Sequence, residues 1–367
     1  MIKKIVAAIG AVLFFNSFLL CADPSAKEKS WLLKEEFLSP DIDHFDCHSS
    51  SLVETKEGAL CAVWKGGAGE GKSNIDMEEG VGIWTSQFDG TSWSEPREIV
   101  SGGSSVCWTP VVCKYPSGEL FLFYRIGSVP RHTVNFLKKS QDGGNTWSDP
   151  DLLPAGIMGP QKNKPLLTAD GALICPSSVS VGEPGDLFKA TACWIDITED
   201  QGKHWKKVGP LELPNQKFGV IEPALFLDAK GHMRILCRDR AHKIGGVGYI
   251  WQAISEDGGN HWSELTRTDL PNPDSAFDVA DLGEGRLVLV YNHSHTHRFP
   301  LNLALSTDGG DHWSQPLVLD EIGEFPAAIV TSDGLIHITY AFPSSCSPDQ
   351  RRIKHVVIDP KKLHPAY

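Results

Sequence analysis

Pairs of short apolar runs joined by a glycine turn recur along the chain. The runs are rich in β-branched and aromatic residues, and Asp-Gly and related turns between such runs predict β-hairpins. No long amphipathic helix pattern interrupts them. The six copies are SSLVETKEGALCAVW, TPVVCKYPSGELFLFY, KPLLTADGALICPSS, EPALFLDAKGHMRILC, FDVADLGEGRLVLVY and FPAAIVTSDGLIHITY. Their turn glycines are Gly58, Gly118, Gly171, Gly231, Gly285 and Gly334.

A second pattern follows five of these hairpins. It is SQFDGTSW at 86–93, SQDGGNTW at 140–147, TEDQGKHW at 198–205, SEDGGNHW at 255–262 and STDGGDHW at 306–313. In each, the Asp accepts hydrogen bonds from turn amides, the Gly adopts positive φ, and the Trp packs beneath the turn. Four of the aspartates therefore have a structural interpretation: Asp142, Asp200, Asp257 and Asp308.

Together the two repeats predict an all-β fold, a six-bladed β-propeller. We call the five turns of the second pattern the Trp turns. The hairpins, together with Trp turns at intervals of 51 to 58 residues, predict four-stranded sheets. A radial arrangement leaves few free sheet edges, whereas a two-sheet sandwich does not explain the period. The segment 31–39 supplies the last strand of the sixth blade. We expect a single domain over residues 31–360.

The N-terminus predicts export. Residues 1–22 read as a signal peptide, with Lys3 and Lys4 before an apolar run from Ile5 to Leu20. That run is too short to span a membrane. We expect a periplasmic or extracellular protein, with lipidation at Cys21 as the weaker alternative. The eight later cysteines lie mostly in apolar strands, which is typical of buried thiols, although export permits a disulfide.

The charge of the chain excludes some partners. It has 34 Lys and Arg against 46 Asp and Glu, a net charge of −12. Such a field repels phosphate, so we expect no nucleic-acid partner. The alternating His293, His295 and His297 fit a solvated loop better than a metal site. No Gly-rich phosphate loop is present, and we expect neither a cofactor nor a metal.

Propeller geometry limits the position of a binding site. Residues just before each first strand and just after each second strand meet at one mouth of the central channel. Before first strands, this rule selects His48, Trp108, Asn163 with Lys164, Glu222, Asp278 and Glu324. After second strands, it selects Trp64 with Lys65, Tyr124 with Arg125, Arg238 to Arg240, Tyr291 with Asn292 and His293, and Tyr340. These groups either bind a ligand or pair with one another and plug the channel.

The repeats carry a family resemblance over residues 44–360. The S-x-D-x-G-x-x-W turns resemble the Asp-box repeats of the sialidase superfamily, and segments such as WTPVVCKYPSGELFLFYRIG, GPQKNKPLL and LPNPDSAFD are similar to predicted neuraminidases with a sialidase-like domain. The resemblance implies three arginines that hold a sugar carboxylate, an aspartate acid/base and a Tyr–Glu nucleophile pair. Arg125 and Arg238 are then candidates for the clamp, and Glu222 for polarising a phenol or for acid/base work.

Three features of the family differ in this chain. The Phe/Tyr-Arg-Ile-Pro motif that holds the first arginine is replaced by FDCHSSSLV, and His355 stands where the family places its tyrosine. Tyr291 or Tyr340 then substitutes, or the nucleophile is lost. A long loop before Val81 offers four acids in place of the expected aspartate: Glu70, Asp76, Glu78 and Glu79.

The leading hypothesis is an exported glycosidase acting on a terminal acidic sugar, sialic acid or a uronic acid. Its expected catalytic residues are Glu222, Asp278, Tyr291 and His355. Its expected substrate-binding residues are Arg125, Arg238, Lys164, Asn292, His48 and Trp108. One alternative is a uronic-acid lyase that uses His355, His293 and Tyr291. Another is a non-catalytic carbohydrate-binding propeller that keeps Trp64, Trp108, Tyr124 and Arg125.

Overall fold

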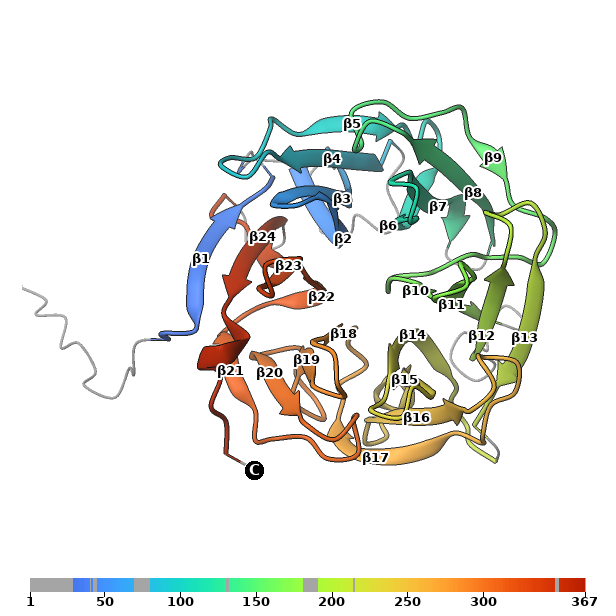
Figure 1. Ribbon diagram of the computed structural model, residues 1–367, viewed down its shortest axis with the longest axis vertical. Coiled ribbons are helices and arrows are strands. Elements are labelled where there is room, and N and C mark those ends of the chain that lie inside the picture. Colours follow the sequence, from blue (N-terminus) through green and yellow to red (C-terminus); the bar gives the residue numbers. More distant parts are fainter. Residues whose placement is uncertain are drawn as a thin grey trace, which may run out of the picture. The chain divides into compact units, whose positions relative to one another are not determined.

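The computed structural model describes residues 29–39, 41, 45–68, 80–129, 132–180, 191–213, 215–346 and 350–366. Residues from Trp31 onward form one compact unit. This unit is a ring of six four-stranded antiparallel sheets around a central channel (Figure 1). The predicted six-bladed β-propeller is thereby confirmed. The signal-peptide prediction falls on residues outside the described part of the chain.

The blades follow one another in chain order. Blade one contains β2 (Phe45–Lys56), β3 (Ala59–Ala68), β4 (Gly82–Phe88) and β5 (Arg97–Val100). Blade two contains β6 (Val106–Lys114), β7 (Leu120–Val129), β8 (His132–Ser140) and β9 (Asp151–Leu152). Blade three contains β10 (Leu166–Leu167), β11 (Leu173–Ser180), β12 (Thr191–Thr198) and β13 (Lys206–Leu211). Blade four contains β14 (Val220–Leu227), β15 (Met233–Asp239), β16 (Tyr249–Ser255) and β17 (Thr266–Pro271).

Two blades and two short helices complete the unit. Blade five contains β18 (Asp278–Asp281), β19 (Leu287–Asn292), β20 (Leu301–Ser306) and β21 (Leu317–Asp320). Blade six contains β22 (Glu324–Val330), β23 (Ile336–Pro343), β24 (Arg351–Ile358) and β1 (Leu32–Phe37). The 3-10 helices are η2 (Ala241–Ile244) and η3 (Pro360–Lys362). Within the described residues, no helix has the length and apolar character needed to cross a membrane.

Blade six joins the two ends of the ring. β1 pairs antiparallel with β24, from Leu32 opposite Ile358 to Phe37 opposite Lys354. The sheet order β1-β24-β23-β22 therefore draws one strand from the N-terminal end and three from the C-terminal end. This pairing covers the outer edge that β24 would otherwise leave open. It confirms the prediction that residues 31–39 supply the last strand.

The repeated Trp turns connect neighbouring blades. In blade four, Asp257 Oδ1 accepts hydrogen bonds from the backbone N–H groups of Asn260 and His261. Gly259 has a φ of +89°, and its carbonyl accepts a hydrogen bond from Trp262 Nε1 at 3.0 Å. Trp262 packs against a core cluster that includes Ile174 of blade three. The turn therefore stabilises the contact between two sheets, as its structural interpretation predicts.

The hydrophobic core lies between the blades. Its clusters combine residues of adjacent sheets, for example Phe226 of blade four with Tyr291 of blade five. The cysteines from Cys47 to Cys346 are all free thiols, and Cys346 alone among them is exposed. Burial raises the pKa of the Cys61 thiol to about 11, so this group stays protonated and unreactive at neutral pH.

Candidate functional site

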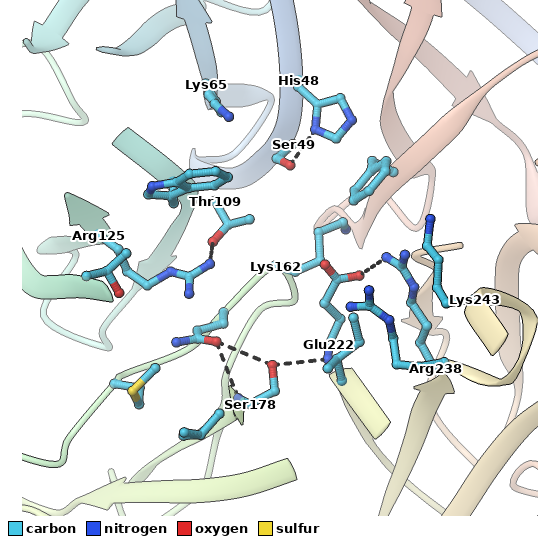
Figure 2. A pocket seen from close by; sticks show the side chains of 18 of the residues that line it. His48, Ser49, Lys65, Thr109, Arg125, Lys162, Ser178, Glu222, Arg238 and Lys243 are labelled. Atoms are coloured by element: carbon cyan, nitrogen blue, oxygen red, sulfur yellow. Dashed lines mark hydrogen bonds and ion pairs between the residues drawn. The ribbon is translucent and has the colours of Figure 1, made fainter. Parts of the chain in front are cut away.

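A pocket of about 410 Å³ lies at one mouth of the channel (Figure 2). Every blade contributes to its lining, from His48 on β2 to Phe325 on β22. Five of the ten predicted site residues line it: His48, Trp108, Arg125, Glu222 and Arg238. The pocket therefore brings together predicted residues that lie far apart in the chain, from His48 in blade one to Arg238 in blade four.

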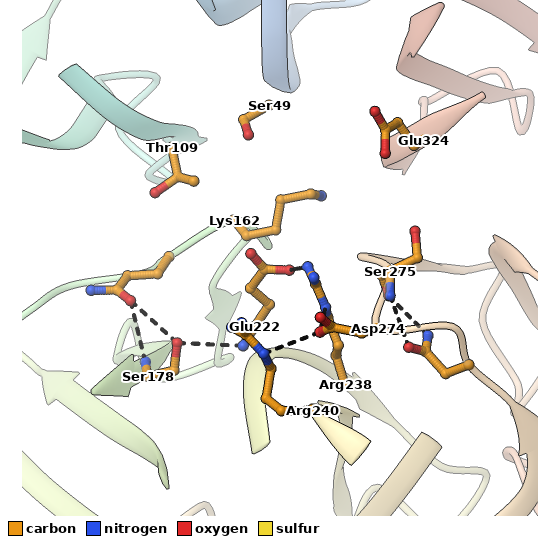
Figure 3. Close-up of polar contacts among 12 residues, drawn as sticks. Ser49, Thr109, Lys162, Ser178, Glu222, Arg238, Arg240, Asp274, Ser275 and Glu324 are labelled. Carbon is orange, nitrogen blue, oxygen red and sulfur yellow. Dashed lines mark hydrogen bonds and ion pairs between the residues drawn. The ribbon is translucent and has the colours of Figure 1, made fainter. Parts of the chain in front are cut away.

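One residue per blade has positive φ near the start of its inner strand. We call these six residues the inner-rim positions; they are Ser49, Thr109, Lys162, Glu222, Asp274 and Phe325, with φ from 28° to 69°. A left-handed backbone is unfavourable for residues with a Cβ and tends to occur at functional sites. β-bulges accompany several of them, as between His48 and Ser51 on β2. Five of the six line the pocket, the exception being Asp274. Ser49, Thr109, Lys162 and Glu222 are drawn in Figure 3.

Sequence reasoning selected Glu222 among the inner-rim positions and missed the other five. The rule on strand ends selects Lys164 instead of Lys162, and Asp278 instead of Asp274. A usable signal was present, because three of these residues directly precede a proline: Thr109, Glu222 and Phe325. These three residues lie nine positions before their turn glycines, as Ser49 and Lys162 also do, so an alignment on the glycines would have found those two. Asp274 lies eleven positions before Gly285 and would not have aligned.

The pocket lining is strongly cationic. Among the described lining residues, seven carry a positive charge: Lys65, Arg125, Lys162, Arg238, Arg240, Lys243 and Arg298. Glu222 is the single carboxylate in that set. This concentration contrasts with the net charge of −12 of the whole chain. A cationic concavity attracts anions locally even when the protein as a whole repels them.

Arg238 organises the blade-four side of the pocket. Its Nη1 lies 2.6 Å from Glu222 Oε2, and its Nε lies 2.8 Å from Asp274 Oδ1. Burial alone would raise the pKa of Glu222, but the charges of Arg238 and Lys162 outweigh it and lower that pKa below its usual value. Glu222 is therefore an ionised carboxylate at the pocket surface, suited to accept a proton rather than to donate one.

The opposite side, from blades one and two, combines cations with aromatic and hydroxyl groups. Arg125 Nη2 donates to Thr109 Oγ1 at 2.9 Å, and burial lowers the pKa of Arg125 to about 10. Lys65 Nζ lies 4.2 Å from the ring centroid of Trp108, within the range of a cation–π contact. The His48 ring packs against Phe325 at a centroid distance of 4.0 Å. An anionic ligand here would face both the planar guanidinium of Arg125 and the compact ammonium of Lys65.

Three consecutive residues of blade three, Lys162 to Lys164, bond through their side chains to blades four, five and six. Asn163 Nδ2 donates to the carbonyls of Glu222 and Pro223, each at 3.1 Å. Lys164 Nζ lies 2.8 Å from Asp278 Oδ1 of blade five. Lys162 Nζ donates to the carbonyl of Pro326 in blade six at 2.6 Å. This segment therefore links four of the six blades across the channel.

This linkage explains where Lys164 and Asp278 lie. Neither lines the pocket, although both were predicted for the site. Asp278 is 2 % exposed, and its Oδ2 also accepts the backbone N–H of Ala328 at 2.8 Å. The Lys164 ammonium additionally donates to the carbonyl of Val279 at 2.7 Å. Their charged groups satisfy each other and the backbone instead of facing a ligand.

Tyr291 and Asn292 also lie outside the pocket lining. Tyr291 is fully buried in the core between blades four and five, and its hydroxyl contacts His293 Nδ1. Asn292 Nδ2 donates to the carbonyls of Pro300 at 3.1 Å and Gly323 at 3.0 Å. Side chains on a strand alternate between faces, so burying Tyr291 in the interblade core directs it away from the channel. Within the described residues, no tyrosine lines the pocket.

His355 belongs to the contact between blades six and one. It is 1 % exposed, its Nδ1 lies 3.0 Å from Glu36 Oε1, and its Nε2 lies 3.0 Å from His337 Nδ1. Trp93, from the first Trp turn, donates to the same Glu36 oxygen at 3.0 Å. The position that the family resemblance gives to a tyrosine is thus occupied by a buried residue of the ring closure.

This buried histidine pair makes stability depend on pH. Burial lowers the pKa of His337 to about 4, whereas the unfolded chain titrates near 6.5. The unfolded state therefore binds more protons below pH 6.5, and the folded state loses stability as pH falls from 6.5 toward 4. We expect His337 to account for a loss of about 2 kcal/mol in unfolding free energy between pH 7 and pH 5.

Urea unfolding of the His337→Gln variant at both pH values measures this contribution. The variant should lose about 2 kcal/mol less than the wild type over the same interval. His364, exposed near the C-terminus, provides the control, and His364→Gln should behave as the wild type. Equal losses in the wild type and His337→Gln would contradict the assignment.

The six-bladed ring with a polar pocket at one mouth defines the chain as a sialidase-like β-propeller. The family model described as BNR repeat-like domain matches residues 58–338, and the chain belongs to this family. Among curated proteins, a Bacteroides fragilis protein named sialidase is 23% identical over 317 residues. That match covers 74% of this chain but only 55% of the relative, so the chain spans about half of the relative's length.

Solved structures share the fold at low sequence identity. A protein of unknown function from Dyadobacter fermentans has a TM-score of 0.73 at 15% identity, covering 89% of this chain and 98% of that one. The Hadza microbial sialidase Hz136 has a TM-score of 0.72 at 17% identity, covering 90% and 69%. The NanB sialidase of Streptococcus pneumoniae has a TM-score of 0.66 at 14% identity, covering 91% and 70%.

Proposed function

We propose that this protein is a glycosidase that removes a terminal acidic sugar, a sialic acid or a uronic acid, from a glycan. The observation that carries the proposal is the set of seven cationic side chains around a pocket with one lining carboxylate. Guanidinium groups bind carboxylates in a planar, bidentate geometry, so Arg125 and Arg238 are the proposed contacts for the sugar acid. The curated relative named sialidase supports the same substrate class.

Glu222 is the proposed catalytic base. Its ionised carboxylate takes a proton from a water molecule, whose oxygen forms a bond to the anomeric carbon while the glycosidic C–O bond breaks. The leaving oxygen then acquires a proton, so one water is consumed for each bond cleaved. Trp108 and His48 supply apolar and polar surface for the sugar ring. The acids proposed as proton donors, Glu70 to Glu79, lie outside the described residues.

Product analysis with the full-length protein tests the proposal. The protein is incubated with 3′-sialyllactose, with a 4-nitrophenyl β-D-glucuronide and with the matching neutral β-D-glucoside, and free sugars are separated by chromatography. Release of an acidic sugar, without release from the neutral glucoside, is the expected result. Absence of release from both acidic substrates, or equal release from the neutral one, would overturn it.

A β-elimination of a uronic acid is a second candidate. It is supported by the cations of the pocket, which would neutralise a carboxylate and so acidify the adjacent C–H. The residues expected as its base and acid, His355, His293 and Tyr291, are not among the lining residues, so another group of the pocket would have to remove the proton. A base removes that proton, the C4–O bond breaks, and a double bond forms between C4 and C5 while the leaving oxygen is protonated. With an oligouronide, elimination yields an ultraviolet-absorbing unsaturated sugar, whereas hydrolysis yields a saturated one.

A further inference from the structure

Lys162 is a buried cation in the lining of the pocket. Its backbone is the inner-rim position of blade three, with a φ of +69°, and its Nζ donates to the carbonyl of Pro326 in blade six. Blades three and six lie opposite each other in the ring (Figure 1). A side chain that bonds from one of them to the other therefore crosses the channel. Lys162 is 1 % exposed and is nevertheless one of the residues that line the pocket.

The partners of this ammonium are neutral. Its Nζ donates to the carbonyl of Pro326 at 2.6 Å and to Asn163 Oδ1 at 3.3 Å. A lysine ammonium has three N–H donors, and the described part of the chain supplies no third acceptor and no ion pair to it. Arg238, by contrast, contacts two carboxylates. Lys162 is therefore a buried cation with one donor left for a ligand oxygen.

Charged groups on three neighbouring blades act on Lys162 at longer range. Burial is the largest influence and lowers the pKa of Lys162 to about 8. The carboxylates of Asp278 and Glu222 act in the opposite direction, while the cations Lys164 and Arg238 add to the lowering. Near pH 8 the ammonium is therefore only partly protonated in the free protein, and an anion placed beside it would favour the charged form.

We propose that Lys162 binds the acid group of the sugar and that its amine takes up a proton when the sugar binds. The inference rests on the proposed function for its ligand class, and it concerns binding and not turnover. Sugar carboxylates are already ionised at neutral pH, so the proton taken up goes to the protein. Uptake should approach half a proton per ligand at pH 8, and affinity should fall about tenfold from pH 7 to pH 9.

Isothermal titration calorimetry of the full-length wild-type protein provides the first test. The probes are N-acetylneuraminic acid and D-glucuronic acid, titrated at pH 8 into two buffers with different ionisation enthalpies. The dependence of the observed enthalpy on the buffer gives the number of protons taken up. About half a proton supports the proposal, and no uptake by a protein that binds either probe overturns it. This arm needs no variant.

Two substitutions assign the proton to Lys162. Lys162→Arg keeps a permanent positive charge, so it should bind without proton uptake and without the affinity loss between pH 7 and pH 9. Lys162→Met should bind at least tenfold more weakly at pH 7. The matched control is Lys114→Arg, because Lys114 also donates to a backbone carbonyl, that of Thr55 at 3.3 Å, but lies outside the pocket lining. If Lys162→Arg retains the wild-type proton uptake, the proposal is wrong.

The outcomes separate this inference from the proposed function. If proton-linked binding occurs but no acidic sugar is released in the product assay, the Lys162 inference stands and the glycosidase proposal fails. If acidic sugars are released while binding shows no proton uptake, the glycosidase proposal stands and the Lys162 inference fails. If neither probe binds at millimolar concentration, the Lys162 inference fails, and the product assay alone decides the glycosidase proposal.

Discussion

Replacing Glu222 by glutamine is expected to abolish turnover while leaving ligand binding intact. The amide keeps the size of the side chain but cannot take a proton from water, so the rate of acidic-sugar release should fall by at least about 10³-fold. Affinity for the acidic sugar should stay the same or increase, because a negative charge is removed from a pocket that binds an anion. Single-turnover kinetics and calorimetry measure the two quantities separately.

A surface glutamate supplies the control for this prediction. Glu284 lies exposed in the turn between β18 and β19, away from the pocket lining, and Glu284→Gln should leave both turnover and affinity unchanged. A Glu222→Gln protein that retains turnover within tenfold of the wild type would exclude Glu222 as the base. A variant that loses affinity in parallel with turnover would instead assign Glu222 to ligand positioning through Arg238.

Replacing Arg238 by methionine is expected to lower the stability of the protein more than any other substitution proposed for it. Methionine preserves much of the side-chain volume but leaves Glu222 and Asp274 without the guanidinium at 2.6 and 2.8 Å. Both carboxylates are largely buried, so removing their partner should lower the free energy of unfolding by about 3–5 kcal/mol. The same variant should bind acidic sugars at least 100-fold more weakly if Arg238 is part of the carboxylate clamp.

The pH dependence of this variant identifies the cause of the loss. Without Arg238, burial raises the pKa of Glu222, and a protonated carboxyl no longer carries the cost of an unpaired charge. The difference in unfolding free energy between the wild type and Arg238→Met should therefore shrink as pH falls from 7 toward 5. The exposed Arg286 gives the control, since Arg286→Met should change stability by less than about 0.5 kcal/mol. A pH-independent difference would point to lost packing instead.

Much of the fold was predictable because its signals are local. The glycine turns and Trp turns have a fixed chemistry, and their spacing reports one blade each. The residues of a Trp turn, such as Asp257 and Trp262, bond within a few positions of one another. Closure of the ring by residues 31–39 followed from counting strands, since a sixth sheet otherwise has one strand too few.

The site was only partly predictable, because knowing which strand ends meet at the channel does not tell which way each side chain at those ends points. The rule that strand ends meet at one mouth identified Arg125, Glu222 and Arg238, which do line the pocket. It also selected Tyr291 and Asp278, whose side chains enter the interblade core or bond to other blades. Residues at equivalent strand ends can face the channel or the neighbouring sheet, and bulges at the rim change which one does so.

The amino-acid sequence by itself determined the repeated hairpins, the turns that join them and hence the number of blades, because each of these depends on contacts between near neighbours in the chain. Only the tertiary structure decided that Lys162 reaches across the channel while Lys164 pairs with Asp278. Both outcomes depend on contacts between residues that lie more than 100 positions apart in the chain. The backbone conformation at the rim and the packing of opposite blades select between the two lysines, and neither is encoded within a single repeat.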